Sequence, residues 1–155
     1  MLRRLRIPSP NKSVGVRYEP VDPVTFAQAI HYVPKTGTFV DLGCGKGRAL
    51  ILANRAGFRK LIGVEFSPAL AAASRRNLAA LGIEAKIVEC DAVNFVFPEE
   101  SCVIYMYNPF GRKVLQQIVP KLRGPVVYIN PVHKLELSGL PIIHEDHAFV
   151  VYGSV

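Results

Sequence analysis

Three acidic side chains stand beside turns that could hold a small molecule, and the first of them precedes a run of glycines. Asp41 comes directly before three glycines at alternate positions, in the sequence DLGCGKG of residues 41–47. Glycine has no Cβ, so the backbone there can bend sharply and a ligand can approach it closely. The residues that we predict to contact a ligand in this loop are Asp41, Gly43, Cys44, Gly45 and Gly47.

The pattern of this loop differs from that of the common phosphate-binding loops. A dinucleotide-binding fingerprint, GxGxxG, would place its third glycine at position 48, where this chain has Arg48. The P-loop pattern GxxxxGK[ST] does not occur in the sequence. Asp41 beside the loop favours a ligand that carries positive charge, such as the amino group of a methionine moiety.

Two further carboxylates follow expected strands at positions that suit an adenosine. Glu65 ends the second expected strand, where a carboxylate can accept hydrogen bonds from both hydroxyls of a ribose. Nicotinamide-binding folds share this arrangement, so Glu65 alone does not choose between cofactors. Asp91 comes just after the third expected strand, where it can accept a hydrogen bond from the exocyclic amine of adenine. Phe66 and Ala92 are predicted to flank the adenine ring.

Taken in order, these segments resemble the first three motifs of class I S-adenosylmethionine (SAM)-dependent methyltransferases. The matching sequences are FVDLGCGKGR (39–48), GVEFSP (63–68) and VECDA (88–92), and the resemblance covers about residues 37–131. It is specific because three motifs appear in order, each at the end of an expected strand.

The resemblance implies that S-adenosyl-L-methionine is the cofactor. It places the glycine loop and Asp41 at the methionine part of SAM, Glu65 at the ribose and Asp91 at the adenine. It also implies a seven-stranded sheet with the strand order 3-2-1-4-5-7-6.

The fourth expected strand ends in Asn108, Pro109 and Phe110, which form the predicted catalytic end of the site. Methyl transfer to nitrogen is an in-line displacement, in which the protein holds a neutral nucleophile about 3 Å from the methyl carbon. The Asn108 oxygen and the next backbone carbonyl can accept hydrogen bonds from an amine and stabilise its growing positive charge. Asn108 is also predicted to contact the cofactor.

The Asn108 segment has a family resemblance of its own. It resembles the (Asn/Asp/Ser)-Pro-Pro-(Tyr/Phe) motif of nitrogen methyltransferases, without the second proline, and the Asn-containing fourth motif of seven-strand protein-lysine methyltransferases. These resemblances imply a nitrogen acceptor. The alternative interpretation is an ordinary turn, because Asn-Pro and Phe-Gly are both turn pairs.

Other candidate residues have weaker support. His133 follows the fifth expected strand and could take a proton from the acceptor, although a loop histidine is the more common case. Tyr18 and Phe26 could fold over the cofactor, but apolar residues of an N-terminal segment more often serve packing. Two histidines and two acidic residues occupy the turn of residues 144–147, which we interpret as solvated, so no metal is predicted.

Strands that end at these residues are expected to alternate with helices. The expected strands are Thr38–Leu42, Lys60–Glu65, Ala85–Glu89, Cys102–Tyr107 and Pro125–Ile129. The expected helices between them are Arg48–Ala56, Pro68–Leu81 and Lys113–Leu122. An earlier helix should begin after Asp22 as N-cap, with Pro23 at its first position. Its apolar stripe would be Val24, Phe26, Ala29, Ile30 and Val33.

This alternation predicts a mostly parallel sheet that is covered on both faces. The strands are continuous apolar runs, as burial on both faces requires. Two extended stretches at 142–143 and 148–152 are joined too tightly for a crossover helix, so they should pair antiparallel. With the strand number implied by the resemblance, the fold class is α/β: a doubly wound, mostly parallel seven-stranded sheet with a C-terminal antiparallel pair.

Length and composition limit the remaining possibilities. A chain of 155 residues that is 50% hydrophobic fits one minimal domain with a filled core. We expect a basic arm and helix over residues 1–35 and a Rossmann-like SAM-binding domain over residues 36–155. The sequence has no apolar run that suits a membrane span or signal peptide, so no membrane partner and a cytoplasmic location are expected.

The predicted function is methyl transfer from SAM to a nitrogen acceptor whose identity stays open. The short inserted loops, 95–101 and 135–140, favour an open site, and the net charge of +7 favours a macromolecular acceptor. Such a site suits a group that protrudes from a protein or an RNA better than a small molecule. The alternatives are a non-catalytic SAM-fold binding module and, with less support, a nicotinamide-dependent oxidoreductase.

Overall fold

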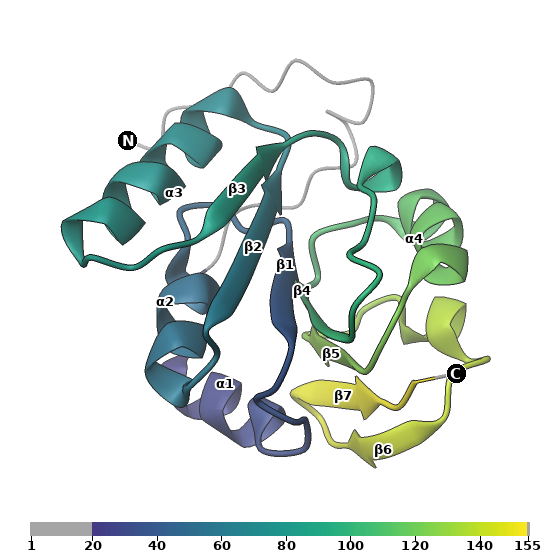
Figure 1. The fold of residues 1–155 in the computed structure, drawn as a ribbon. Coiled ribbons are helices and arrows are strands. Elements are labelled where there is room, and N and C mark those ends of the chain that lie inside the picture. Colours follow the sequence, from purple (N-terminus) through teal and green to yellow (C-terminus); the bar gives the residue numbers. More distant parts are fainter. Residues whose placement is uncertain (1–19, 155) are drawn as a thin grey trace, which may run out of the picture.

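A mixed sheet of seven strands forms the centre of the described part of the chain (Figure 1). The computed structural model describes residues 20–154. The strands are β1 (Thr38–Leu42), β2 (Lys60–Glu65), β3 (Lys86–Glu89), β4 (Cys102–Tyr107), β5 (Val126–Ile129), β6 (Ile142–Glu145) and β7 (Phe149–Tyr152). Their order is β3-β2-β1-β4-β5-β7-β6, as predicted. Neighbours from β3 to β5 are parallel, whereas β7 runs antiparallel to β5 and β6.

The central strands are buried on both faces. Every residue of β1, β5 and β7 is buried, and β4 is buried except at Tyr107. The edge strands β3 and β6 contain only half-buried and exposed positions. Burial on both faces explains why the central strands are continuous apolar runs, and the predicted fold class is confirmed.

Helices cover both faces of the sheet. One face carries α1 (Pro23–Ile30), α2 (Arg48–Ala56) and α3 (Pro68–Ala80), which share one apolar core with it. The other face carries α4 (Arg112–Ile118) and the 3₁₀ turns η1 (Ala92–Asn94), η2 (Val119–Lys121) and η3 (Lys134–Leu137). No helix within residues 20–154 is long and apolar enough to cross a membrane.

Several predicted boundaries are wrong by one to four residues. The helix predicted to reach Leu122 ends at Ile118, because Pro120 has no N–H to continue the α-helical hydrogen-bond ladder. The third, fifth and seventh strands each begin one residue later than predicted, and β6 continues two residues further. Part of the predicted loop at 135–140 belongs to η3.

The first helix begins as its sequence predicts. The Asp22 carboxylate accepts a hydrogen bond from the Thr25 backbone N–H at 2.9 Å, and Pro23 takes the first helical position. Phe26 and the later members of the predicted apolar stripe are buried, but Val24 is 63% exposed and does not belong to it. The predicted basic arm falls mainly on residues 1–19, which lie outside the described residues.

Candidate active site

A cleft of about 200 Å³ lies at the carboxyl ends of β1, β2, β4 and β5. This is the edge at which open α/β sheets bind their ligands. The structure brings most of the predicted site residues together there. Those that line the cleft are Asp41, Gly43, Cys44, Gly45, Glu65, Phe66, Ala92, Asn108, Pro109 and Phe110.

Two predicted cofactor residues do not line the cleft. Gly47 is the N-cap of α2 with a left-handed φ of 88°, and a Cβ there would lie 2.7 Å from the Ser74 Oγ. The Asp91 side chain accepts a hydrogen bond from the Val93 N–H at 3.1 Å and so begins η1. Ala92, the neighbour of Asp91, reaches the cleft in its place.

The glycine loop uses its backbone N–H groups within the protein. The Gly43 and Cys44 N–H groups both donate to the Val64 carbonyl, at 2.8 and 3.0 Å. The Gly45 N–H donates to the Glu65 Oε2 at 2.9 Å. A phosphate-binding loop needs its N–H groups directed at the ligand. These three N–H groups are therefore not directed at a dinucleotide pyrophosphate.

Gly43 also joins the loop to the predicted catalytic segment. Its φ is 84°, and a Cβ on Gly43 would lie 2.8 Å from the Pro109 Cβ. A side chain at this position would therefore collide with the turn after β4. Because glycine has none, the loop after β1 and the turn after β4 meet along one side of the cleft.

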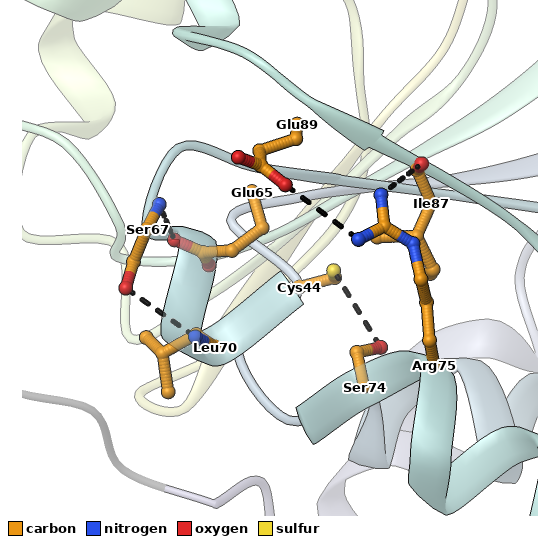
Figure 2. A network of polar contacts seen from close by, with 8 residues as sticks. All are labelled: Cys44, Glu65, Ser67, Leu70, Ser74, Arg75, Ile87 and Glu89. Carbon is orange, nitrogen blue, oxygen red and sulfur yellow. Dashed lines mark hydrogen bonds and ion pairs between the residues drawn. The ribbon is translucent and has the colours of Figure 1, made fainter. Parts of the chain in front are cut away.

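Glu65 joins the loop to the start of α3, and Figure 2 shows the contacts at the α3 end of this link. Its Oε1 accepts a hydrogen bond from the Ser67 N–H at 2.9 Å, and the Ser67 Oγ in turn accepts from the Leu70 N–H at 3.3 Å. The Glu65 side chain is buried, and this burial raises its pKa although the bonds from Ser67 and Gly45 oppose the change. Each carboxylate oxygen keeps lone-pair capacity for a ligand.

Asp41 gives the cleft a second buried carboxylate. Only 3% of the residue is exposed. Burial, and after it the negative charge of Glu65, raises the pKa of Asp41 well above its usual range. Two carboxylates in an otherwise mostly apolar cleft favour a ligand that brings positive charge and hydrogen-bond donors.

Two buried polar atoms that have no hydrogen-bond partner among residues 20–154 lie in residues that line the cleft. They are the Tyr105 hydroxyl and the Asn108 Oδ1, in residues that are 1% and 8% exposed. Tyr105 is the register partner of Asp41 across β1 and β4. Burial and the nearby Asp41 raise the pKa of Tyr105 well above its usual range. Such orphaned groups are uncommon in native proteins and indicate a place for a bound group.

Sequence reasoning missed several residues that line the cleft. Tyr105 could have been found by aligning the parallel strands, since it lies opposite Asp41. Arg48 was considered only as a departure from the dinucleotide pattern, yet its Nε donates to the Val21 carbonyl at 2.8 Å. This bond attaches the segment before α1 to the first residue of α2. Asn130, at the end of β5, also lines the cleft.

The weaker candidates lie away from the cleft or outside the described residues. Phe26 packs against Phe39 and Tyr105 in the core, with ring centroids 6.1 and 5.4 Å apart. His133 does not line the cleft, and its N–H donates to the Tyr128 hydroxyl at 3.2 Å. Tyr18 lies outside the described residues.

Residues 144–147, predicted as a turn, form a local polar cluster in which His144 and Glu145 belong to the end of β6. His144 stacks on Tyr32, with the ring centroids 4.2 Å apart, and its Nε2 lies 3.3 Å from the Asp146 Oδ2. The Asp146 carboxylate also accepts from the backbone of Ala148 at 2.7 Å. Within residues 20–154 no three histidine, cysteine or acidic side chains are placed to hold a metal ion.

Two features are those of the class I methyltransferase fold: the strand order, and a ligand cleft with buried carboxylates at the carboxyl ends of the parallel strands. The sequence agrees, because residues 39–123 match the methyltransferase domain family. The chain therefore belongs to this family, which uses SAM as its methyl donor. The predicted family, fold and type of methyl donor are confirmed at this level.

Individual relatives differ in what they methylate. The chain is 36% identical over 72 residues to a demethylmenaquinone methyltransferase of Thermus thermophilus, a match that covers 46% of this chain and 32% of that protein. The chain thus spans only about a third of that relative.

Solved structures show the same fold. An RNA methyltransferase of Salinibacter ruber in complex with S-adenosylhomocysteine superposes with a TM-score of 0.62 at 20% identity, over 86% of this chain and 91% of that one. A geranyl diphosphate C-methyltransferase of Streptomyces coelicolor, with S-adenosylhomocysteine bound, gives a TM-score of 0.56 at 20% identity, over 69% and 42%. Their acceptors differ, so the likeness establishes the fold and leaves the acceptor open.

Proposed function

We propose that the chain is a SAM-dependent methyltransferase that transfers the methyl group to a nitrogen atom. The Asn108 Oδ1 carries the proposal, because it is buried at the end of β4 with no partner among residues 20–154. A buried oxygen that accepts no hydrogen bond costs free energy, and the N–H of an acceptor amine would remove that cost. A carbon acceptor has no N–H to donate, so it would leave the Asn108 oxygen without a partner.

The acidic cleft supports SAM as the ligand. Asp41 and the Tyr105 hydroxyl would receive the amino-acid end of the cofactor, since both are buried and neither has a cationic partner in the described chain. Glu65 would accept from the ribose hydroxyls while it still holds Gly45 and Ser67. Ala92 would contact the adenine ring, with Asp91 beside it at the start of η1.

The protein's task in this reaction is positioning. Bound SAM supplies an activated methyl group on a sulfonium sulfur, which leaves as a neutral thioether. The Asn108 oxygen accepts from the N–H of the acceptor, and this aims the nitrogen lone pair at the methyl carbon. The same hydrogen bond strengthens as positive charge grows on the nitrogen, so it stabilises the transition state more than the bound acceptor.

The acceptor is proposed to belong to a protein or an RNA. Within residues 20–154 the insertions are short and leave little structure to enclose a small acceptor, and the net charge of +7 suits a polyanion. A cytoplasmic location, and residues 1–35 as a separate arm and helix, stay predictions.

Ligand binding tests the cofactor. Calorimetric titration with SAM and S-adenosylhomocysteine should give clear binding, whereas NADH should give none, because the loop donates its N–H groups internally. Binding of NADH without binding of SAM would restore the oxidoreductase alternative.

Methyl transfer tests the reaction. We expect radioactive methyl from SAM to enter a macromolecular fraction. Asn108→Gly removes the side-chain amide while keeping a left-handed backbone available. Turnover should fall roughly tenfold to a hundredfold, from the loss of a hydrogen bond to a charged group, while SAM affinity holds. Asn94→Gly, at the end of η1, is the control and should turn over normally.

Two results would contradict these assignments. Equal loss of turnover and SAM affinity in Asn108→Gly would mean that Asn108 is structural. Tight SAM binding with no transfer to protein, RNA or metabolite fractions would favour the non-catalytic binding module instead.

A further inference from the structure

Two Asn-Pro pairs stand side by side at the rim of the cleft. Asn108-Pro109 follows β4 and Asn130-Pro131 follows β5. The last residues of these parallel strands, Tyr107 and Ile129, are register partners, so the next residues on each strand are neighbours across the sheet. Both asparagines line the cleft.

These two asparagines share an unusual backbone conformation. Their φ values are 37° and 49°, and within the described chain they are the only residues other than glycine with positive φ. A left-handed backbone costs an ordinary residue roughly 1–2 kcal/mol, asparagine somewhat less and glycine least. Proline after such a residue normally favours an extended backbone instead. A turn alone would be made with less strain by glycine, so the side chains need a separate explanation.

The backbone of Asn130 is fixed by its neighbours, which leaves its side chain for another partner. Its N–H donates to the Ala148 carbonyl at 2.8 Å, and its carbonyl accepts from the Val132 N–H at 2.8 Å. Its side-chain amide makes no hydrogen bond to any residue within 20–154, and the residue is exposed at the rim. Asn108 is the buried member of the pair, with an unpartnered oxygen.

We propose that Asn130 is a second acceptor-positioning residue, which works with Asn108 to hold a planar nitrogen group at two points. This inference rests on the proposed function. The Asn108 oxygen would accept from an N–H of the nitrogen that is to be methylated, and the Asn130 amide N–H would donate to a lone pair next to it. The nitrogen lone pair would form the new N–CH₃ bond as the S–CH₃ bond of the donor breaks, and the methylated nitrogen would then release its proton to water in the open cleft. Carboxamides and aminoheterocycles present such a donor beside an acceptor on one edge.

The pairing therefore narrows the chemical class of the acceptor. An isolated ammonium, such as that of a lysine side chain, offers only donors and could not use the Asn130 N–H. A carboxylate or a carbon acceptor would leave the Asn108 oxygen without its donor. The acceptor class that uses both amides is an amide-like or amidine-like nitrogen.

The product identifies the class directly. The protein is incubated with radioactive SAM and the total RNA or total protein of its source, and the digested products are identified by mass spectrometry. We expect N-methylation of an aminoheterocycle in the RNA arm or of a carboxamide in the protein arm. Methyl-lysine, a methyl ester or a C-methyl product would overturn the inference.

Variants of Asn130 test its role separately. Asn130→Gly keeps the left-handed backbone and removes the amide, and Asn130→Asp keeps the shape but replaces the N–H donor with an oxygen. Both should lower kcat/KM for the acceptor about tenfold or more, with unchanged melting temperature and S-adenosylhomocysteine affinity. If Asn130 served only to form the turn, both variants would keep the wild-type kcat/KM, and that result would refute the role.

The wild-type protein separates this inference from the proposed function. If wild-type protein transfers methyl groups and both variants match its kcat/KM, only the role of Asn130 is refuted. If wild-type protein neither binds SAM nor transfers a methyl group, the proposed function is wrong and the inference falls with it.

Discussion

Replacing Tyr105 with phenylalanine should make the ligand-free protein more stable and bind its cofactor less well. The hydroxyl is buried beside Asp41 and has no partner within residues 20–154. A buried polar group without a partner costs about 1–3 kcal/mol. Removing the oxygen should raise the free energy of unfolding by about this amount. For a domain of this size, 1 kcal/mol corresponds to roughly 2–4 °C in melting temperature. Thermal unfolding of ligand-free Tyr105→Phe should therefore occur several degrees higher.

Affinity should change in the opposite direction. If the hydroxyl receives the amino-acid end of the cofactor beside Asp41, Tyr105→Phe loses a hydrogen bond to a charged group. That loss is worth about 1.5–3 kcal/mol, or at least about tenfold in the dissociation constant of S-adenosylhomocysteine. 5′-Methylthioadenosine lacks the amino-acid end, so calorimetry should show its affinity unchanged by the same substitution.

Tyr128 supplies the matched control. It is fully buried in β5, but its hydroxyl accepts a hydrogen bond from the His133 N–H at 3.2 Å. Tyr128→Phe should therefore lower the melting temperature, because it leaves that N–H without its partner. The reasoning about Tyr105 is refuted if both variants are destabilised alike, or if Tyr105→Phe weakens S-adenosylhomocysteine and 5′-methylthioadenosine equally.

Three further predictions follow from the cleft. Glu65→Ala should weaken SAM binding at least about tenfold by calorimetry, since a charged acceptor of several hydrogen bonds is lost; unchanged affinity would contradict its placement. Gly43→Ala should abolish SAM binding and lower the melting temperature more than Gly82→Ala, because both glycines have left-handed φ but only Gly43 would meet another residue, Pro109 at 2.8 Å. Burial raises the pKa of Asp41 above 3.8, so the folded state binds this proton more tightly than the unfolded state. The free energy of unfolding of the ligand-free protein should then fall as the pH rises from 3.8 through the raised pKa of Asp41. Melting temperatures measured over this pH range should depend less on pH in Asp41→Asn than in the wild-type protein.

Much of the fold could be predicted because its signals are local. The strand Thr38–Leu42 and the helix that starts at Arg48 were predicted with the bounds that the structure shows. Apolar runs indicated strands buried on both faces, and Asp22 with Pro23 marked the start of α1. Where a helix was predicted too long, the cause was also local, since Pro120 interrupts the N–H ladder.

The site was predicted less completely, because its chemistry depends on contacts between distant segments. The sequence places Asp41 before a glycine loop but does not show that Glu65 takes the Gly45 N–H, 20 residues away. It gives Tyr105 no motif, and the Asn-Pro pair at Asn130 is typical of an ordinary turn. These residues become candidates only when β1, β4 and β5 are set side by side and their unpartnered atoms face one cleft.

The distribution of unfavourable features over the cleft bears on whether the chain is an enzyme. Burial of Asp41, Glu65 and Tyr105 is unfavourable, and hydrogen bonds from a bound cofactor would be enough to offset it. Asn108 and Asn130 have strained backbones, and the Asn108 oxygen has no partner within residues 20–154. Both residues lie on the side of the cleft that the ends of β4 and β5 form. An acceptor that binds and reacts on that side of the cleft would explain both features, because it would supply the donor that the Asn108 oxygen lacks.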